Sequence, residues 1–274
     1  MAESWWSPLV LTSVEAWSLV QRGLGVVIFL QALEQWSSRR ALDDDGIWAW
    51  PLPQRHGGRQ RTPSHPRGRT SHEIVMRGII VARMLSGAVM LALRDVGVAV
   101  SFVAFGTSIL MSMRFRGREN GAADAMTNLV ALSVFAVDGA SAFNIEATQT
   151  GLVFIASQSV LSYFSAGMTK VRRPLWRSGR ALRTFVGIER YGAPTWTEPL
   201  LAVPGFTTVA SLCLMAWQMT FPLSVLTPSW CILACLIGLV FHVINFFVFG
   251  LQRFVWSWAI TYPAVWFVST FVAG

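Results

Sequence analysis

The sequence predicts an all-α fold, a polytopic transmembrane helical bundle of about eight spans in a single membrane domain that covers residues 1–274. The chain is 53% hydrophobic and 13% charged, whereas a soluble domain carries about 25% charged residues. Its mean hydropathy is +0.49. Eight stretches approach the length of about 20 mainly apolar residues that a bilayer-spanning helix needs. They are residues 10–33, 73–93, 96–113, 122–137, 147–168, 200–223, 230–249 and 254–272.

The first two spans are separated by a segment of different character. Residues 35–72 contain three consecutive aspartates and a run rich in Arg, Pro, Gly and His, without apolar periodicity. Such composition predicts a mobile polar loop. Within the second span, Gly78 and Gly87 with small residues between them predict close helix packing.

The remaining spans are justified by the polar segments between them. A turn at Arg94 and Asp95 joins the second and third spans, and the fourth is entered through Asp124 and left through Asp138. The fifth ends at the stretch Tyr163–Gly179 and is followed by an arginine-rich loop that reaches about Pro199.

The basic residues are distributed unevenly over the predicted loops. The loops after spans one, three, five and seven hold 18 of the 22 basic residues. Positively charged loops stay in the cytoplasm, so we expect a multi-pass protein of the cell inner (plasma) membrane with its arginine-rich loops cytoplasmic and both termini outside. This topology also accounts for the net charge of +8 without a nucleic-acid partner, and the lipid bilayer is the predicted environment.

Several charged side chains fall at membrane depth, where each costs about 2.5–3.5 kcal/mol on insertion scales and marks a candidate functional residue. Arg22 lies about midway along the first span, with Glu15 two helical turns earlier as a possible partner. Arg77 and Arg83 lie in the second span. We interpret Arg77 as snorkelling to lipid headgroups and leave Arg83 open between snorkelling and a buried role.

Uncharged polar residues form a second set of candidates. His242 and Asn245 are three residues apart on the seventh span, so they share a helix face and could line one pocket. A buried histidine bonded to a neighbouring helix is the alternative. Gln158 lies about three turns before Lys170 on the fifth span and either lines the same cavity or bridges helices. No metal site is predicted, because the loop histidines lack the spacing of metal ligands.

Lys170, at the end of the fifth span, is the only lysine among the 22 basic residues. Arginine stays protonated in proteins, whereas a partly desolvated lysine can lose its proton and act as a base. Two other interpretations stay open. Lysine could be depleted by chance in this sequence, or Lys170 could be a loop cation that faces headgroups.

The stretch around Lys170 resembles a motif of the membrane domain of vitamin K-dependent gamma-carboxylase and its bacterial relatives, the HTTM-domain proteins. That motif, Tyr-Phe-x-Ala-Gly-x-x-Lys followed by Trp and Gly, is matched here by Tyr163, Phe164, Ala166, Gly167, Lys170, Trp176 and Gly179. A Gln five residues before the Tyr is matched by Gln158. A second patch with family-like spacing is formed by Phe241, His242, Asn245, Phe254 and Pro263.

The resemblance implies a function. In the carboxylase, the motif lysine deprotonates vitamin K hydroquinone, which then reacts with oxygen. Lys170 is therefore the predicted catalytic base. The predicted substrate-binding residues for a vitamin K-like quinone or hydroquinone, or another lipid-soluble small molecule, are Gln158, His242, Asn245, Arg22, Arg83 and Trp176.

The chain also departs from the carboxylase pattern. The animal carboxylase has a large non-membrane domain that binds the propeptide and substrate, whereas this sequence ends at Gly274, soon after the last span. Protein carboxylation by this chain alone is therefore not expected. No histidine stands near the fourth span, where the carboxylase has a functional one; the sequence there is Asn120-Gly-Ala-Ala-Asp124. The carboxylase lysine works on the lumenal side, whereas the charge count places Lys170 on the cytoplasmic side.

Two functions of different class follow. The first is a carboxylase- or epoxidase-like enzyme or a quinone-linked oxidoreductase. The alternative is a non-catalytic accessory protein for maturation or export of a secreted peptide, which requires a partner membrane protein or peptide. A carrier is not favoured, because the sequence shows no gapped half-helices or paired repeats.

Overall fold

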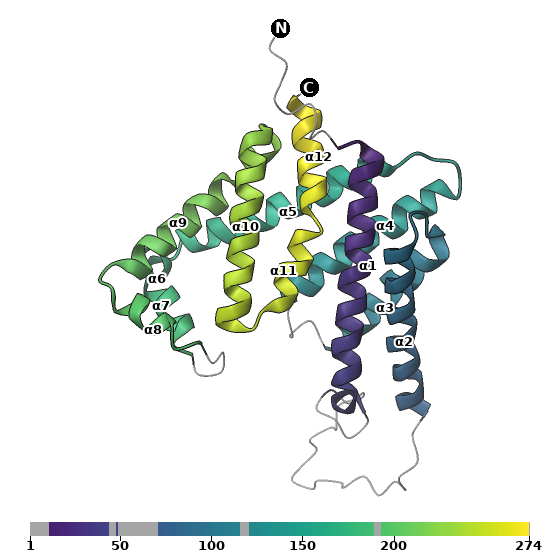
Figure 1. Cartoon of the computed structure of the whole chain (residues 1–274), viewed down its shortest axis with the longest axis horizontal. Coiled ribbons are helices and arrows are strands. Elements are labelled where there is room, and N and C mark those ends of the chain that lie inside the picture. The colour runs from purple at the N-terminus through teal and green to yellow at the C-terminus, as the bar shows by residue number, and fades with distance from the viewer. Residues whose placement is uncertain (1–10, 44–47, 49–70, 116–120, 189–192, 274) are drawn as a thin grey trace, which may run out of the picture. The chain divides into compact units, whose positions relative to one another are not determined.

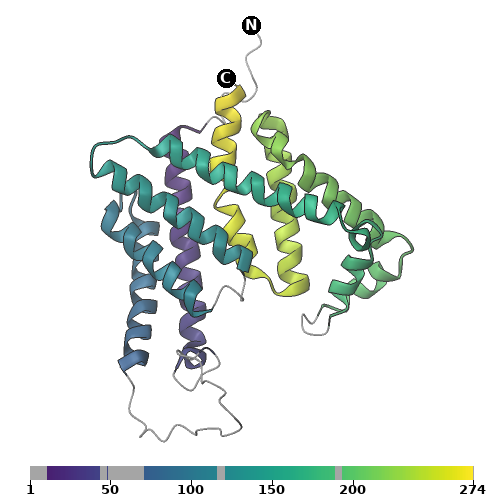
Figure 2. The same cartoon turned by 180° about the vertical axis from the view of Figure 1, so that it is seen from behind.

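The structure is a computed structural model and describes residues 11–43, 48, 71–115, 121–188 and 193–273 (Figures 1 and 2). Every regular element among these residues is a helix, which confirms the predicted all-α membrane bundle. Seven helical segments in this part of the chain are long and apolar enough to cross a membrane. The chain is thus a multi-pass membrane protein. The seven are Ser13–Ser37, Glu73–Ala92, Gly97–Arg114, Thr148–Val171, Phe206–Val225, Pro228–Phe249 and Gln252–Ala273.

The fourth predicted span, residues 122–137, is not among these seven candidate membrane spans. Residues 122–137 lie within α4 (Gly121–Ser141), which is helical throughout. Asp124, Asn128 and Asp138 lie within this helix and lower its mean hydropathy. The helix was therefore predicted correctly, while its classification as a membrane span stays a prediction.

The predicted loop of residues 35–72 begins with ordered structure. The helix α1 (Ser13–Ser37) continues into it, and the short 3-10 helix η2 (Arg39–Leu42) follows. Leu42 is buried in an apolar cluster with Ile80 and Met111. Residues 44–47 and 49–70 of the predicted loop lie outside the described residues, so its mobility stays a prediction.

The chain divides into two compact units, which we call the first unit (residues 1–20 and 143–274) and the second unit (residues 21–142). In the second unit, α3 (Gly97–Arg114) packs against both α2 (Ser71–Ala92) and α4. A Cβ atom added to Gly87 would lie 2.8 Å from the backbone oxygen of Gly25, so glycine allows α1 and α2 to cross closely. Gly78 has no heavy atom within 4 Å of such a Cβ, so only one of the two predicted packing glycines is used.

The first unit is built around α5, which contacts α9 and α12, and around α10, which contacts α11 and α12 (Figures 1 and 2). Three short helices, α6 to α8, connect α5 to α9. The elements are α5 (Thr148–Val171), α6 (Pro174–Arg177), α7 (Arg180–Val186), α8 (Thr197–Ala202), α9 (Phe206–Thr220), η4 (Phe221–Val225), α10 (Pro228–Phe249), α11 (Gln252–Ala259) and α12 (Tyr262–Ala273).

Two predicted spans are interrupted in the structure. The predicted span 200–223 is divided at Gly205, which has a φ of +78°. The predicted span 254–272 breaks into α11 and α12 just before Pro263, because proline lacks the N–H that a continuous helix requires. At this break the Thr261 hydroxyl lies 2.9 Å from Ser159 Oγ on α5 and 2.7 Å from the Trp258 carbonyl oxygen.

Candidate functional site

The last turns of α5 present Tyr163, Gly167 and Lys170 on one face, because residues three and four apart are neighbours on a helix. This face lies against α9. A Cβ added to Gly167 would lie 2.9 Å from the Gln218 Cβ, so only glycine permits the two helices to approach this closely. The approach places the Gln218 side chain beside the lysine.

Lys170 is half-buried, and its ammonium group has three described neighbours. The Nζ atom donates to Gln218 Oε1 at 3.0 Å and to the Ala166 carbonyl oxygen at 3.3 Å. It also lies 5.2 Å from the centre of the Trp176 ring, a distance at which a cation is attracted to an indole face. Lys170 is therefore held within the last turn of α5 and is not a loop cation.

The segment after α5 is fixed on α9 by backbone contacts. Gly179 has a φ of +71°, and a Cβ there would come within 2.5 Å of the Thr207 backbone. The Ser211 hydroxyl donates to the Trp176 carbonyl oxygen at 2.5 Å, and Thr208 Oγ1 donates to the Ser178 carbonyl oxygen at 3.0 Å. These contacts hold Trp176 next to Lys170.

Two turns back along α5, Tyr163 joins a buried hydrogen-bond chain. Its hydroxyl lies 2.8 Å from His242 Nε2 and 2.8 Å from the Tyr262 hydroxyl. Tyr163 and His242 are each 2% exposed. A Cβ at Gly238 would lie 2.4 Å from the Tyr262 hydroxyl, so this position of α10 has to be glycine to leave room for the chain. A tyrosine hydroxyl both donates and accepts, so protons in such a chain can be arranged in either direction.

Aromatic rings enclose these polar groups. Tyr163 packs against Trp217 at 4.9 Å and Phe221 at 4.2 Å between ring centres. His242 stacks on Trp258 at 5.1 Å. The second ring nitrogen of His242, Nδ1, is buried and makes no hydrogen bond with the described residues. Because buried polar atoms are normally paired, this nitrogen is able to take a further partner.

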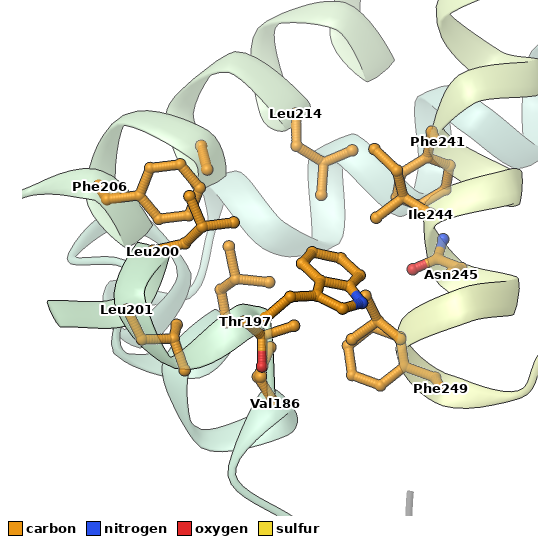
Figure 3. A pocket seen from close by; sticks show the side chains of 14 residues that line it. Val186, Thr197, Leu200, Leu201, Phe206, Leu214, Phe241, Ile244, Asn245 and Phe249 are labelled. Atoms are coloured by element: carbon orange, nitrogen blue, oxygen red, sulfur yellow. The ribbon is translucent and has the colours of Figure 1, made fainter. Parts of the chain in front are cut away.

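A cavity of about 270 Å³ lies between α7, α8, α9 and α10 (Figure 3). Its walls are almost entirely apolar. Within the described part of the chain, the side-chain amide of Asn245 makes no hydrogen bond. Lining residues include Leu182, Val186, Trp196, Leu214, Ile244 and Asn245.

Phe241 forms a common wall between this cavity and the buried hydrogen-bond chain. It lines the cavity, and its ring lies 5.5 Å from Trp217 and 5.0 Å from His242. The same face of α9 contacts both the cavity and the lysine. Leu214 lines the cavity, and Gln218, which bonds to Lys170, lies one helical turn further along.

A different polar cluster lies in the second unit. Arg83 is 2% exposed, and it donates to Ser108 Oγ at 2.5 Å and to Gln31 Oε1 at 2.5 Å. Gln31 in turn donates to Thr127 Oγ1 at 3.4 Å. These contacts decide the question left open by the sequence: Arg83 is a buried residue and does not snorkel.

The other charged candidates are placed differently. Glu15 is exposed and accepts hydrogen bonds from the Thr12 backbone and hydroxyl, and no ion pair joins it to Arg22 in the described part of the chain. Arg22 has a buried Nε atom without a hydrogen-bond partner. Arg77 lies 3.4 Å from Asp43 and 3.8 Å from Glu73, so it pairs with carboxylates near the start of α2.

The structure brings together some of the residues predicted for the site. Trp176 contacts Lys170, as expected for a shared site. His242 and Asn245 do not line the same cavity, since His242 faces Tyr163 while Asn245 faces the space next to α7 and α8. Gln158 is half-buried, and its side chain makes no hydrogen bond with the described residues. Arg22 and Arg83 belong to the second unit.

Other residues of the site were not found from the sequence. Gln218 was overlooked because a single glutamine in an apolar helix carries no spacing signal, and Tyr262 because it follows the helix break. Among the described residues no three His, Cys, Asp or Glu side chains are grouped as metal ligands would be. The lack of a metal site stays a prediction.

Comparison with known proteins adds no relative. No family model, curated protein or solved structure matches the chain.

Proposed function

We propose that this protein is a membrane-embedded enzyme in which Lys170 acts as a general base on a lipid-soluble, quinone-like substrate. The observation that carries the proposal is the position of the only lysine. It is half-buried at the end of α5, bonded to Gln218 at 3.0 Å and packed near Trp176. The resemblance of Tyr163–Gly179 to the gamma-carboxylase motif supports the same role and the assignment to HTTM-type proteins.

Gln218 is a suitable hydrogen-bond partner for a group that gains and loses a proton. An amide carries both an acceptor oxygen and a donor nitrogen. The oxygen accepts from the ammonium form of Lys170, and after rotation of the amide the nitrogen donates to the neutral amine. One side chain can therefore satisfy both protonation states of the lysine.

The proposed step is a single proton transfer. The neutral amine of Lys170 takes the proton of a hydroquinone hydroxyl, which leaves an ammonium group and a quinol anion. Trp176 offers a ring face on which an aromatic substrate can stack. The exposed arginines Arg172 and Arg173 follow directly after α5, and their charge favours the anion. From the charge count we also propose a plasma-membrane location with this end of α5 in the cytoplasm.

The test measures turnover of a defined substrate. The protein in lipid nanodiscs receives a reduced short-chain naphthoquinone and oxygen, and oxidised and epoxide products are quantified by mass spectrometry. General bases contribute roughly 10²–10⁴-fold to rates, so Lys170→Ala and Lys170→Arg are each expected to lower product formation by about 100-fold or more.

The control variant is Arg94→Gln, which removes an exposed arginine between α2 and α3 and leaves the amine in place. It is expected to retain most of the activity. Full activity of Lys170→Arg would exclude the base role, because arginine does not give up its proton. An inactive wild type that co-purifies with a stoichiometric partner protein would instead favour the accessory function.

A further inference from the structure

We propose that the cavity between α7, α8, α9 and α10 binds an acyl chain of an anionic membrane phospholipid, whose headgroup contacts the arginines of α7. This inference does not depend on the chemistry proposed for Lys170.

The first step is the chemistry of the cavity. A buried water needs two to four polar partners, and an apolar cavity of about 150 Å³ stays dry and takes up benzene. The cavity described here holds about 270 Å³ and offers one unengaged amide, that of Asn245 (Figure 3). It is therefore suited to hydrocarbon and not to water. One amide among apolar walls also matches the single ester carbonyl at the start of an acyl chain, to which its N–H can donate.

The second step is the charge next to the cavity. Residues 171–188 contain five arginines and no acidic residue, and all five arginine side chains are exposed. They are Arg172, Arg173, Arg177, Arg180 and Arg183. Arginine binds phosphate through paired N–H groups, so this segment favours an anionic headgroup. The exposed Glu198 on α8 opposes it with one negative charge.

The third step joins these two features on one helix. On α7, Leu182 and Val186 line the cavity, and Arg183 lies between them in sequence. At 100° per residue, Arg183 falls about 60° beyond Val186 on the helix surface, so it borders the cavity face. Arg180 lies one turn earlier. A headgroup held by Arg180 and Arg183 would thus lie at the border of the space in which its chain is buried.

The fourth step is the location of α7 relative to the membrane spans. The helices α6, α7 and α8 connect α5 and α9, both of which belong to candidate membrane spans. This segment therefore lies where spans end, at the level of the lipid phosphates. An amphipathic helix with arginines on one side and apolar residues on the other is suited to that interface.

The experiment uses photoactivatable lipids on the full-length protein in nanodiscs. Phosphatidylglycerol and phosphatidylcholine carry the same diazirine-bearing acyl chain, and labelled peptides of α7, α9 and α10 are quantified by mass spectrometry. Each arginine near an anionic surface contributes about fivefold in affinity, so phosphatidylglycerol is expected to label these peptides about fivefold or more over phosphatidylcholine.

Two pairs of variants locate the site. Ala210 lines the cavity, and Ala210→Phe is expected to remove labelling of these peptides by both lipids. Val209→Phe, on the 60% exposed neighbour, is expected to leave it unchanged. The double variant Arg180→Gln with Arg183→Gln should abolish the preference for phosphatidylglycerol, whereas Arg40→Gln with Arg94→Gln, which removes two exposed arginines elsewhere, should retain it.

The outcomes separate the occupants. Equal labelling of the wild type by the two lipids would overturn the anionic headgroup, and unchanged labelling of Ala210→Phe would overturn the cavity as the chain site. If Ala210→Phe does not fold, Ala210→Leu adds less volume and is expected to reduce labelling in the same peptides.

Discussion

The two units solve the problem of burying polar side chains among apolar helices in different ways. In the second unit, a permanent cation, Arg83, is bonded to the neutral partners Gln31 and Ser108. In the first unit, Tyr163, His242 and Tyr262 form a hydrogen-bond chain that contains no permanent charge, and one imidazole nitrogen has no described hydrogen bond. The cation cannot change its protonation state, whereas this chain can reverse its hydrogen bonds or accept a new partner.

This difference assigns different roles to the two clusters. Arginine has only donors and stays charged, so the Arg83 cluster joins α1, α2 and α3 in one fixed arrangement. Tyrosine and neutral histidine each carry a donor and an acceptor. The cluster around Tyr163 lies on the same face of α5 as Lys170, and we therefore propose it as the region where a substrate or proton is exchanged.

The largest expected effect of a substitution on stability is at Arg83. Arg83→Met leaves Gln31 Oε1 and Ser108 Oγ without their donor, and two lost hydrogen bonds to a charged group are expected to lower the free energy of unfolding by about 3 kcal/mol. Arg77→Met on the same helix removes half-buried ion pairs and is expected to cost less than about 1 kcal/mol. Reversible unfolding in mixed micelles measures both. Equal losses for the two variants would contradict a structural role specific to Arg83.

A smaller effect is expected in the hydrogen-bond chain of the first unit. Tyr163→Phe removes both bonds of the chain and leaves His242 Nε2 unpaired, so we expect a loss of about 2 kcal/mol.

Tyr262→Phe provides the matched control, because it keeps the bond between Tyr163 and His242. Its expected cost is about 1 kcal/mol. The same unfolding measurement applies to both. If Tyr262→Phe cost as much as Tyr163→Phe, Tyr163 would not be the centre of the chain.

Much of the fold could be predicted from the sequence, because membrane spans are a local property. Apolar stretches of about 20 residues mark them directly, and seven of the eight predicted spans overlap candidate membrane spans of the structure. The break before Pro263 could also have been anticipated from the chemistry of proline. The short helix η2, in contrast, depends on the packing of Leu42 against Ile80 and Met111. No local sequence pattern reveals this contact.

The candidate site was predictable only in part, because it also depends on contacts between residues that lie far apart in the sequence. Lys170 is singled out by composition, because it is the only lysine in the sequence, and Trp176 by its place in the stretch that resembles the carboxylase motif. Gln218 lies 48 residues from Lys170 in sequence, and its role follows from the close approach of α5 and α9 at Gly167. The surroundings of His242 could be predicted only in part. Its three-residue spacing from Asn245 does not reveal that Tyr163 and Tyr262 lie next to it.

The central claim is that a lipid-soluble quinone binds next to Lys170. It can be tested by measuring how fast the amine of Lys170 is chemically modified. In an Arg40→Lys background, an amine-reactive reagent modifies Lys170 and one exposed reference lysine, and mass spectrometry follows both rates. With an oxidised naphthoquinone at about ten times its dissociation constant, modification of Lys170 is expected to slow by about tenfold while the reference rate stays unchanged. An unchanged rate at Lys170 in the presence of the quinone would contradict the claim.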